Sequence, residues 1–465
     1  MGTMTRSLAR LEPVAVLAAA AAAGAGIVLL AYAAGPVAPL AVTAALILAV
    51  LSAARPVAAL YAAVALVPLE LVYVSVGPAA LSPTEAMLAL TGIGWAVSRV
   101  VRGEAPFVPS PLGKPLGLLV LALVPGLAIA PEPVAVAKVL VIWTTFLLVY
   151  QMIVAEADAR VVRNLLLVLG LAAAVVGTIA LVRSGGAAPE LSGFGDTATG
   201  RARGSFGHPN TLATFQVLAL PGAIMLALAG RAALRPVAAV AAAVIFAGLA
   251  LSLSRGGLLA IAGGLAMMLL WAPFRRTVAA AALIVLVLAL VGGNPLGDTQ
   301  QVQVLTQRLQ SIEYSAEGVD PRFRVWEVTP EIIADHPVFG VGENAFPLIA
   351  PRYNLLLGNS DSTYDHAHNI PLTIAAELGL VGLAALVWFV VVLTRVLVRG
   401  YRISRHRERG AVVALAAAFV GLAVQGLVDY TLRASVIVGV IFLLAGCAVV
   451  LARGQPAAQR AADST

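Results

Sequence analysis

The stretch IPLTIAAELGLVGLAALVWFVVVLT, Ile370–Thr394, decides the fold class of this chain. It is almost entirely apolar, and it is longer than the roughly 20 residues that a helix needs to cross a bilayer. The residues just before it are polar and include two histidines, His366 and His368. A segment in lipid must satisfy its own backbone hydrogen bonds, so this stretch is predicted to be a membrane helix with a histidine-bearing mouth.

The whole 465-residue chain has the same character, with 60% hydrophobic and 11% charged residues. A soluble protein of this composition would expose too much apolar surface. The apolar runs are long and rich in Ala, Leu and Val, which favours helices over the short alternating strands of a barrel. The net charge of +7 does not indicate nucleic acid, because the basic residues gather at helix ends as topology signals. The sequence therefore predicts an all-α polytopic membrane protein in contact with membrane lipids.

About 12–14 transmembrane helices are predicted, because several apolar runs are only just long enough to cross. The candidate runs lie at residues 12–33, 36–53, 56–76, 82–100, 114–130, 133–154, 161–183, 210–230, 235–253, 256–272, 276–292, 370–398, 411–430 and 433–452.

The 30 Lys and Arg residues predict an orientation. With the N-terminus in the cytoplasm, most of them fall on the cytoplasmic side, as the positive-inside rule requires, and the C-terminus is cytoplasmic too. We expect N-terminal membrane helices at 1–183 and membrane helices with Arg-bearing outer loops at 184–292. A large periplasmic loop with short helices follows at 293–369, and C-terminal membrane helices with a cytoplasmic tail end the chain at 370–465. A loop as long as 293–369 is more often functional than connective.

Arginines at two helix mouths are candidates for anion binding. Arg203 lies in GRARGSFGHPN (200–210), just before a helix predicted to start near Asn210, and Arg255 lies in LSLSRGGLLA (251–260). Guanidinium groups grip phosphate oxygens bidentately, and a helix N-terminus adds N–H donors. Together they would form a diphosphate cradle. The alternative is that each arginine reaches lipid headgroups or pairs with an acid.

The histidines offer a second kind of chemistry. A neutral His368 at a helix mouth could take a proton from a hydroxyl, as a general base does near neutral pH. The simpler alternative is that Asn369 caps the helix and the histidines are solvated. His208 and His336 each precede a proline and are predicted to add only loop polarity.

Two further patterns are weaker. Asp365, His366 and His368 have a spacing that permits a metal, but H-x-H is short and common, so no metal site is expected. The run GVGEN (340–344) lacks the third glycine and the βαβ context of a dinucleotide fingerprint, so it is predicted to be a tight turn.

The segment HNIPLTIAAELGLVG (368–382) has the pattern His, Asn/Ser/Gln, nine residues, Gly, two residues, Gly. This pattern resembles the O-antigen ligase family, within a superfamily that also holds O-antigen polymerases. Three other segments resemble the same superfamily and occur in the expected order: RGSFGHPN (203–210), SLSRGG (252–257) and RFRVWEVTPEIIADHPVFGVGENAF (322–346).

The resemblance implies a GT-C-like enzyme of the bacterial inner membrane that transfers glycans at the periplasmic face, without metal or other cofactor. The donor would be a glycan on undecaprenyl diphosphate. The acceptor would be a sugar hydroxyl, on lipid A-core in ligases and on another lipid-linked glycan in polymerases. A lipid or polysaccharide transporter is the alternative from another class, but transporters usually place their polar residues near the bilayer midplane and show repeats.

The resemblance also assigns roles by position. His368 would be the base that activates the acceptor hydroxyl. Arg203 and Arg255, with Arg322 as a weaker candidate, would hold the diphosphate. Supporting positions would be Asn369, His366, Asn210, Gly379 and Gly382.

Overall fold

The computed structural model describes residues 50, 53–70, 74–76, 79–184, 201–280, 321–356 and 365–453. The predicted span 12–33, nearly all of 36–53 and most of 276–292 lie outside the described residues. So do residues 185–200, 293–320 and 357–364 of the two predicted outer segments.

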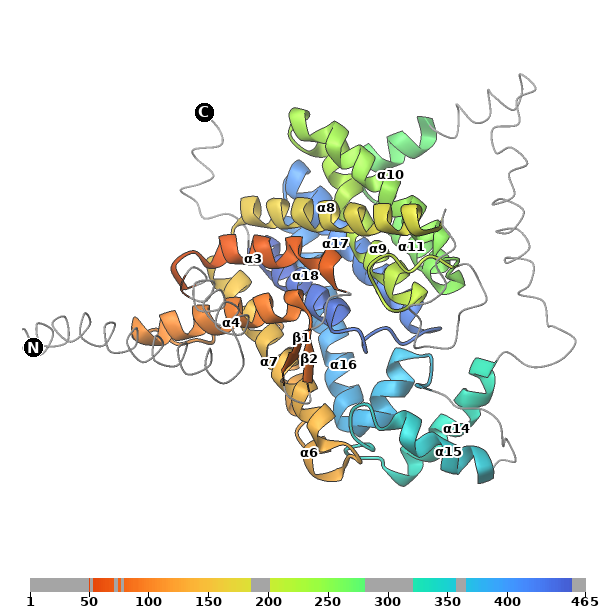
Figure 1. The fold of residues 1–465 in the computed structure, drawn as a ribbon. Helices are drawn as coiled ribbons and strands as arrows, with labels where there is room; N and C mark the ends of the chain where they lie inside the picture. Colours follow the sequence, from red (N-terminus) through yellow and green to blue (C-terminus); the bar gives the residue numbers. More distant parts are fainter. Residues whose placement is uncertain are drawn as a thin grey trace, which may run out of the picture.

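The described chain is almost entirely helical (Figure 1). A proline in the first turn starts many of these helices, where its missing N–H has no intrahelical partner to lose. One short antiparallel hairpin, β1 (Val74–Val76) with β2 (Ala79–Leu81), interrupts them. The α-helices are α3 (Pro56–Ala65), α4 (Pro83–Val101), α5 (Gly113–Leu121), α6 (Gly126–Ile129), α7 (Pro133–Glu156), α8 (Ala159–Ser184), α9 (Pro209–Ala229), α10 (Arg235–Leu251), α11 (Arg255–Met268), α14 (Pro321–Asp335), α15 (Phe346–Leu356), α16 (Ile370–Ile403), α17 (His406–Gly426) and α18 (Ser435–Arg453).

The prediction of an all-α polytopic membrane protein is confirmed. Within the described residues, 7 helices are long and apolar enough to cross a membrane, or up to 8 if the bent pair Arg255–Met268 and Ala272–Ala280 is one span. In the described parts of 56–76 and 114–130, the apolar helices are Pro56–Ala65 and Gly113–Ile129, which are shorter than the roughly 20 residues that a membrane span needs. Pro68 and Pro125 fall inside these runs, and proline cannot continue the helical hydrogen-bond ladder.

Helices α9, α17 and α18 form the centre of the bundle. Of their most apolar windows, 78%, 78% and 94% of the residues are buried by the rest of the protein, against 28% for both α10 and α16. Figure 1 shows α17 and α18 in the middle of the molecule, with α14 and α15 together at one edge. The polar site described below lies where the central helices begin or end.

Helix α16 is broken at Gly379, which has φ +67°. The turn 337–342 pairs with the break through its backbone: Val341 N–H donates to the Ala376 carbonyl at 2.9 Å, and Leu380 N–H donates to the Pro337 carbonyl at 2.8 Å. A Cβ on Gly379 would collide with the Val338 carbonyl. Glycine is therefore required at this position for two reasons: the positive φ angle and the close approach of the Val338 carbonyl.

This geometry gives a first prediction, that Gly379→Ala lowers the thermal stability of the detergent-solubilised protein. Left-handed backbone costs a residue with a Cβ about 1–3 kcal/mol, and the collision adds to it. The measurement is the temperature at which the monodisperse gel-filtration peak is half lost after heating. Gly117→Ala in α5 is the control, because no atom lies within 4 Å of its Cβ position. Equal loss temperatures for the two variants would contradict the packing described.

Candidate functional site

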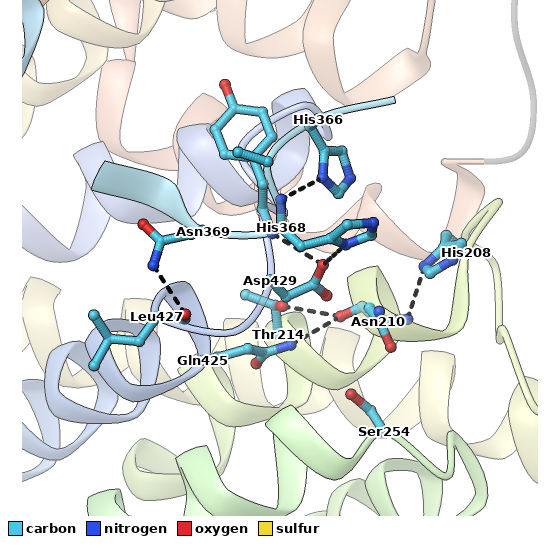
Figure 2. A network of polar contacts seen from close by, with 12 residues as sticks. His208, Asn210, Thr214, Ser254, His366, His368, Asn369, Gln425, Leu427 and Asp429 are labelled. Carbon is cyan, nitrogen blue, oxygen red and sulfur yellow. Dashed lines mark hydrogen bonds and ion pairs between the residues drawn. The ribbon is translucent and has the colours of Figure 1, made fainter. Parts of the chain in front are cut away.

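Polar side chains from four elements meet at one end of the central bundle. They come from the start of α9, the start of α16, the start of α11 and the segment 427–434 between α17 and α18 (Figure 2). Segments more than 200 residues apart in sequence touch here, since the Gln425 side-chain amide donates to the Asn210 carbonyl at 3.4 Å. The helix ends thus bring together three of the four motifs noted in the sequence.

His368 faces a buried carboxylate. Its Nδ1 lies 3.4 Å from Oδ1 of Asp429, whose side chain is 6% exposed against 29% for the histidine. His368 has φ +49°, an uncommon conformation for a residue with a side chain. A carboxylate at one ring nitrogen fixes the tautomer and orientation of an imidazole and leaves the other nitrogen available to a reacting group. Asp429 was not singled out by the sequence, because it lies 61 residues further along.

His366 supports the turn that carries His368. Its Nδ1 accepts a hydrogen bond from the His368 N–H at 3.1 Å, and the two rings are 4.2 Å apart. Burial and, to a smaller extent, the neighbouring His368 lower the pKa of His366 to about 3. His366 is therefore neutral over the physiological range, and its Nδ1 is already engaged. The structure thus separates the two histidines, with only His368 paired to an acid.

Three further contacts hold this turn in place. Asn369 caps α16, accepting from Leu372 N–H at 2.9 Å, and its amide donates to the Leu427 carbonyl at 3.0 Å. From α14, the Trp326 indole N–H donates to the Ala367 carbonyl at 2.8 Å. The capping role considered for Asn369 is confirmed, but the histidines are not merely solvated. The long loop also reaches the site, through Trp326 of the 322–346 motif.

Arg201 connects the motif at 203–210 with the motif at 252–257. Its Nη2 donates to Oδ1 of Asn210 at 2.7 Å, and its Nε donates to the Ser252 carbonyl at 2.9 Å. His208 Nδ1 accepts from Asn210 N–H at 3.1 Å and so caps α9. Figure 2 places His208 across from His368, so the prediction that His208 adds only loop polarity is too weak. The sequence singled out Arg203, whereas the described contact across the motifs is made by Arg201.

The predicted cradle arginines lie near these contacts. Arg203 is half-buried in the turn before α9, where its carbonyl accepts Phe206 N–H at 3.0 Å. Arg255 is the first residue of α11, capped by the Ser254 hydroxyl, which accepts Gly257 N–H at 3.2 Å. Arg322 lies in the first turn of α14, and its side chain is outside the described residues. The cradle itself stays a prediction.

The supporting glycines lie away from the histidines. Gly379 and Gly382 are at the break of α16, where they shape the helix rather than contact His368. The run GVGEN is a tight turn, as predicted, since Gly340 and Gly342 have φ of +67° and +96°.

A pair of buried acids lies beside this turn, and the sequence reading missed it. Glu343 and Glu377 are only 3% and 2% exposed, and Oε1 of Glu377 accepts Phe346 N–H at 3.2 Å. Burial raises the pKa of Glu343 to about 7, although the positive charge of Arg433 acts to lower it. Arg433 also donates to Oδ1 of Asn344 at 3.1 Å. These contacts fix the turn against α16 next to the site.

One group of three residues within the described chain could hold a metal. The ligand atoms of His366, His368 and Asp429 all lie within 4.8 Å of one another. This set differs from the spacing-based one, since Asp429 takes the place of Asp365. Nitrogen and carboxylate donors suit zinc. Nδ1 of His366 already accepts a hydrogen bond from the backbone, so in this arrangement only its Nε2 could bind an ion.

The fold and the site define a polytopic membrane protein with a histidine–carboxylate pair at one end of its helix bundle. The O-antigen ligase family model matches residues 217–387, so this part of the chain is similar to that family. A search of curated proteins finds no match.

Proposed function

We propose that the protein transfers a glycan from a lipid diphosphate to a sugar hydroxyl, with His368 as general base. The observation that carries this proposal is the His368–Asp429 pair, which orients one ring nitrogen and leaves the other for the acceptor. The acceptor oxygen gives its proton to His368 and bonds to the anomeric carbon. The bond from that carbon to the diphosphate oxygen breaks, and Arg203 and Arg255 stabilise the charge on the leaving diphosphate.

The reaction is proposed to take place at the periplasmic face of a bacterial inner membrane. The basic residues support this orientation, because Arg399, Arg402 and Arg405 lie at the end of α16 opposite His368. Donor and acceptor would then be undecaprenyl-diphosphate-linked glycan and lipid A-core. The polymerase alternative differs only in the acceptor, which would be a second lipid-linked glycan.

A cavity next to the site supports a lipid-linked donor. It has a volume of about 490 Å³ and a nearly all-apolar wall contributed mainly by α16, α17 and α18. Ile370, Pro371 and Leu427 line it beside the site, and Tyr401 and Arg402 line it at the other end of α16. A chain of isoprene units lying along this cavity would bring its diphosphate to the histidine mouth.

The cavity gives a second prediction, that Leu393→Trp raises the KM for the lipid-linked donor several-fold while kcat changes little. Leu393 lines the cavity and is 4% exposed, so a larger ring takes up space the lipid needs. Steady-state kinetics with purified donor in detergent measure the effect. Val387→Trp is the control, since Val387 lies on the same helix, is 54% exposed and does not line the cavity. An unchanged KM in Leu393→Trp would argue against this lipid site.

A product assay tests the reaction itself. Purified protein is given undecaprenyl-diphosphate-linked glycan with and without lipid A-core, and the products are separated by mass. Glycan joined to lipid A-core supports the ligase, and longer lipid-linked glycan without lipid A-core supports the polymerase. No transfer under either condition would overturn the proposal.

A third prediction concerns the metal alternative. Because the pair needs no ion to orient His368, treatment with EDTA is expected to leave the initial rate unchanged. The measurement is the transfer rate before and after chelation and gel filtration. A rate lost on chelation and restored by one divalent ion would assign His366, His368 and Asp429 to a metal instead.

A further inference from the structure

A second pocket lies among the helices of the long loop. It has a volume of about 670 Å³, within the range of ligand pockets, and is formed by the end of α14, the turn 337–341, α15 and the end of α6. Its wall includes Asp335, His336, Phe339, Ile349, Arg352 and Tyr353. We call it the loop pocket. It shares no lining residue with the histidine site.

The polar groups of the loop pocket suit a ligand with many hydroxyls. The Tyr353 hydroxyl donates to Oδ2 of Asp335 at 2.8 Å. Burial and the Asp335 carboxylate raise the pKa of Tyr353 to about 12, so the phenol keeps its proton. Asp335 can accept further hydrogen bonds, Arg352 can only donate them, and His336 can do either. This mixture of donors and acceptors matches hydroxyl groups, which both donate and accept.

The apolar part of the loop pocket is unusually exposed. Phe339 and Val338, at the tip of the turn, are 47% and 53% exposed and both line the pocket. An aromatic ring offers a flat apolar face, and the ring of Tyr353 lies in the same wall. A pyranose has one face of C–H groups and a rim of hydroxyls, so it satisfies the rings and the polar groups at once.

The loop pocket is rigidly joined to the histidine site. Val341 lines the pocket, and its N–H donates to the Ala376 carbonyl at 2.9 Å; Gly342 N–H donates to the Glu377 carbonyl at 2.9 Å. The first segment of α16 runs from there to Asn369. At the rise of an α-helix, the eight residue steps from Asn369 to Glu377 span about 12 Å. A glycan held in the pocket would therefore reach His368 through further sugar units.

We propose that the loop pocket binds a pyranose unit of a glycan substrate at a distance from the bond that forms, an inference that rests on the proposed glycan transfer. The chain bound there belongs either to the donor or to the acceptor. The chemistry of recognition is the same for both.

Direct binding of soluble sugars tests this inference. One probe is the oligosaccharide released by mild acid from the host's lipid-linked glycan, and the other is the host's acceptor saccharide freed of its acyl chains. Saturation-transfer NMR with the purified full chain measures each dissociation constant. We expect one of the probes to bind, and Phe339→Ala and Asp335→Asn to weaken that binding about tenfold. The probe that binds identifies the source of the chain.

The control is Phe107→Ala, because Phe107 is 56% exposed and lies outside the pocket. If neither probe binds, or if Phe339→Ala binds as the wild type does, the inference is wrong. Loss of binding to vesicles of phosphatidylethanolamine and phosphatidylglycerol, with sugar binding unchanged, would instead assign Phe339 to the membrane surface. The probes carry no diphosphate, so sugar binding through Phe339 without any glycan transfer would uphold the pocket and overturn the proposed function.

Discussion

His368→Ala is expected to abolish glycan transfer while the protein stays folded in the membrane. Removing a general base typically costs about 10²- to 10⁴-fold in rate. His368 is 29% exposed and packs no core, so its loss should leave the bundle intact. The measurement is the single-turnover rate with saturating lipid-linked donor. His406→Ala is the control, since His406 begins α17 at the opposite end of the bundle.

Substitution of Asp429, the partner of His368, tests whether His368 acts as a base or is only a polar residue at the helix mouth. Asp429 acts through the ring it orients, so Asp429→Asn should lower kcat with the donor KM unchanged. Free imidazole should restore part of the rate to His368→Ala but none to Asp429→Asn, whose own imidazole still occupies the site. Unchanged turnover in His368→Ala would remove this residue as the base.

The second large effect is expected at the arginines. Arg255→Ala and Arg203→Ala should each lower transfer about 10²- to 10³-fold, the cost typical of losing one donor to a developing negative charge. Arg255→Lys should retain part of the rate, because an ammonium keeps the charge but loses the bidentate fork. Turnover and donor KM are measured for each variant. Arg235→Ala, at the exposed start of α10, is the control.

Arg201 offers an internal comparison for the same experiment. Both of its described contacts go to protein, Asn210 and the Ser252 carbonyl, so Arg201→Ala should destabilise the junction of the two motifs. The melting temperature of Arg201→Ala should therefore be lower than that of the wild type. If Arg203→Ala and Arg255→Ala leave both donor affinity and turnover unchanged, the diphosphate cradle is wrong.

The fold class could be predicted from the sequence because apolar length and helix-starting prolines act locally. His368 could be chosen over His366 because it stands next to Asn369 at the helix mouth and alone fits the spacing to Gly379 and Gly382. Asp429 could not, since the contact depends on how the end of α17 packs beside the start of α16. The same limit explains Arg201: two arginines separated by one residue look alike until the turn decides which one faces Asn210.

The break in α16 could not be predicted either. Its glycines fit the spacing to His368 seen in the resemblance, which suggested support for the site. The neighbour of Gly379 is instead the backbone of 337–342, about 40 residues earlier in the chain, and only tertiary pairing identifies it. Short helices in place of spans at 56–76 and 114–130 were missed because apolar composition outweighed the two internal prolines.

The short first segment of α16 acts as a spacer of fixed length. One end is capped by Asn369 beside His368, and the other is held by backbone bonds to the turn at 337–342. If a glycan binds in the loop pocket as proposed, only those hydroxyls or anomeric carbons that lie one spacer length away would reach His368. The position of the new bond along the glycan would then be set by the length of this helix segment.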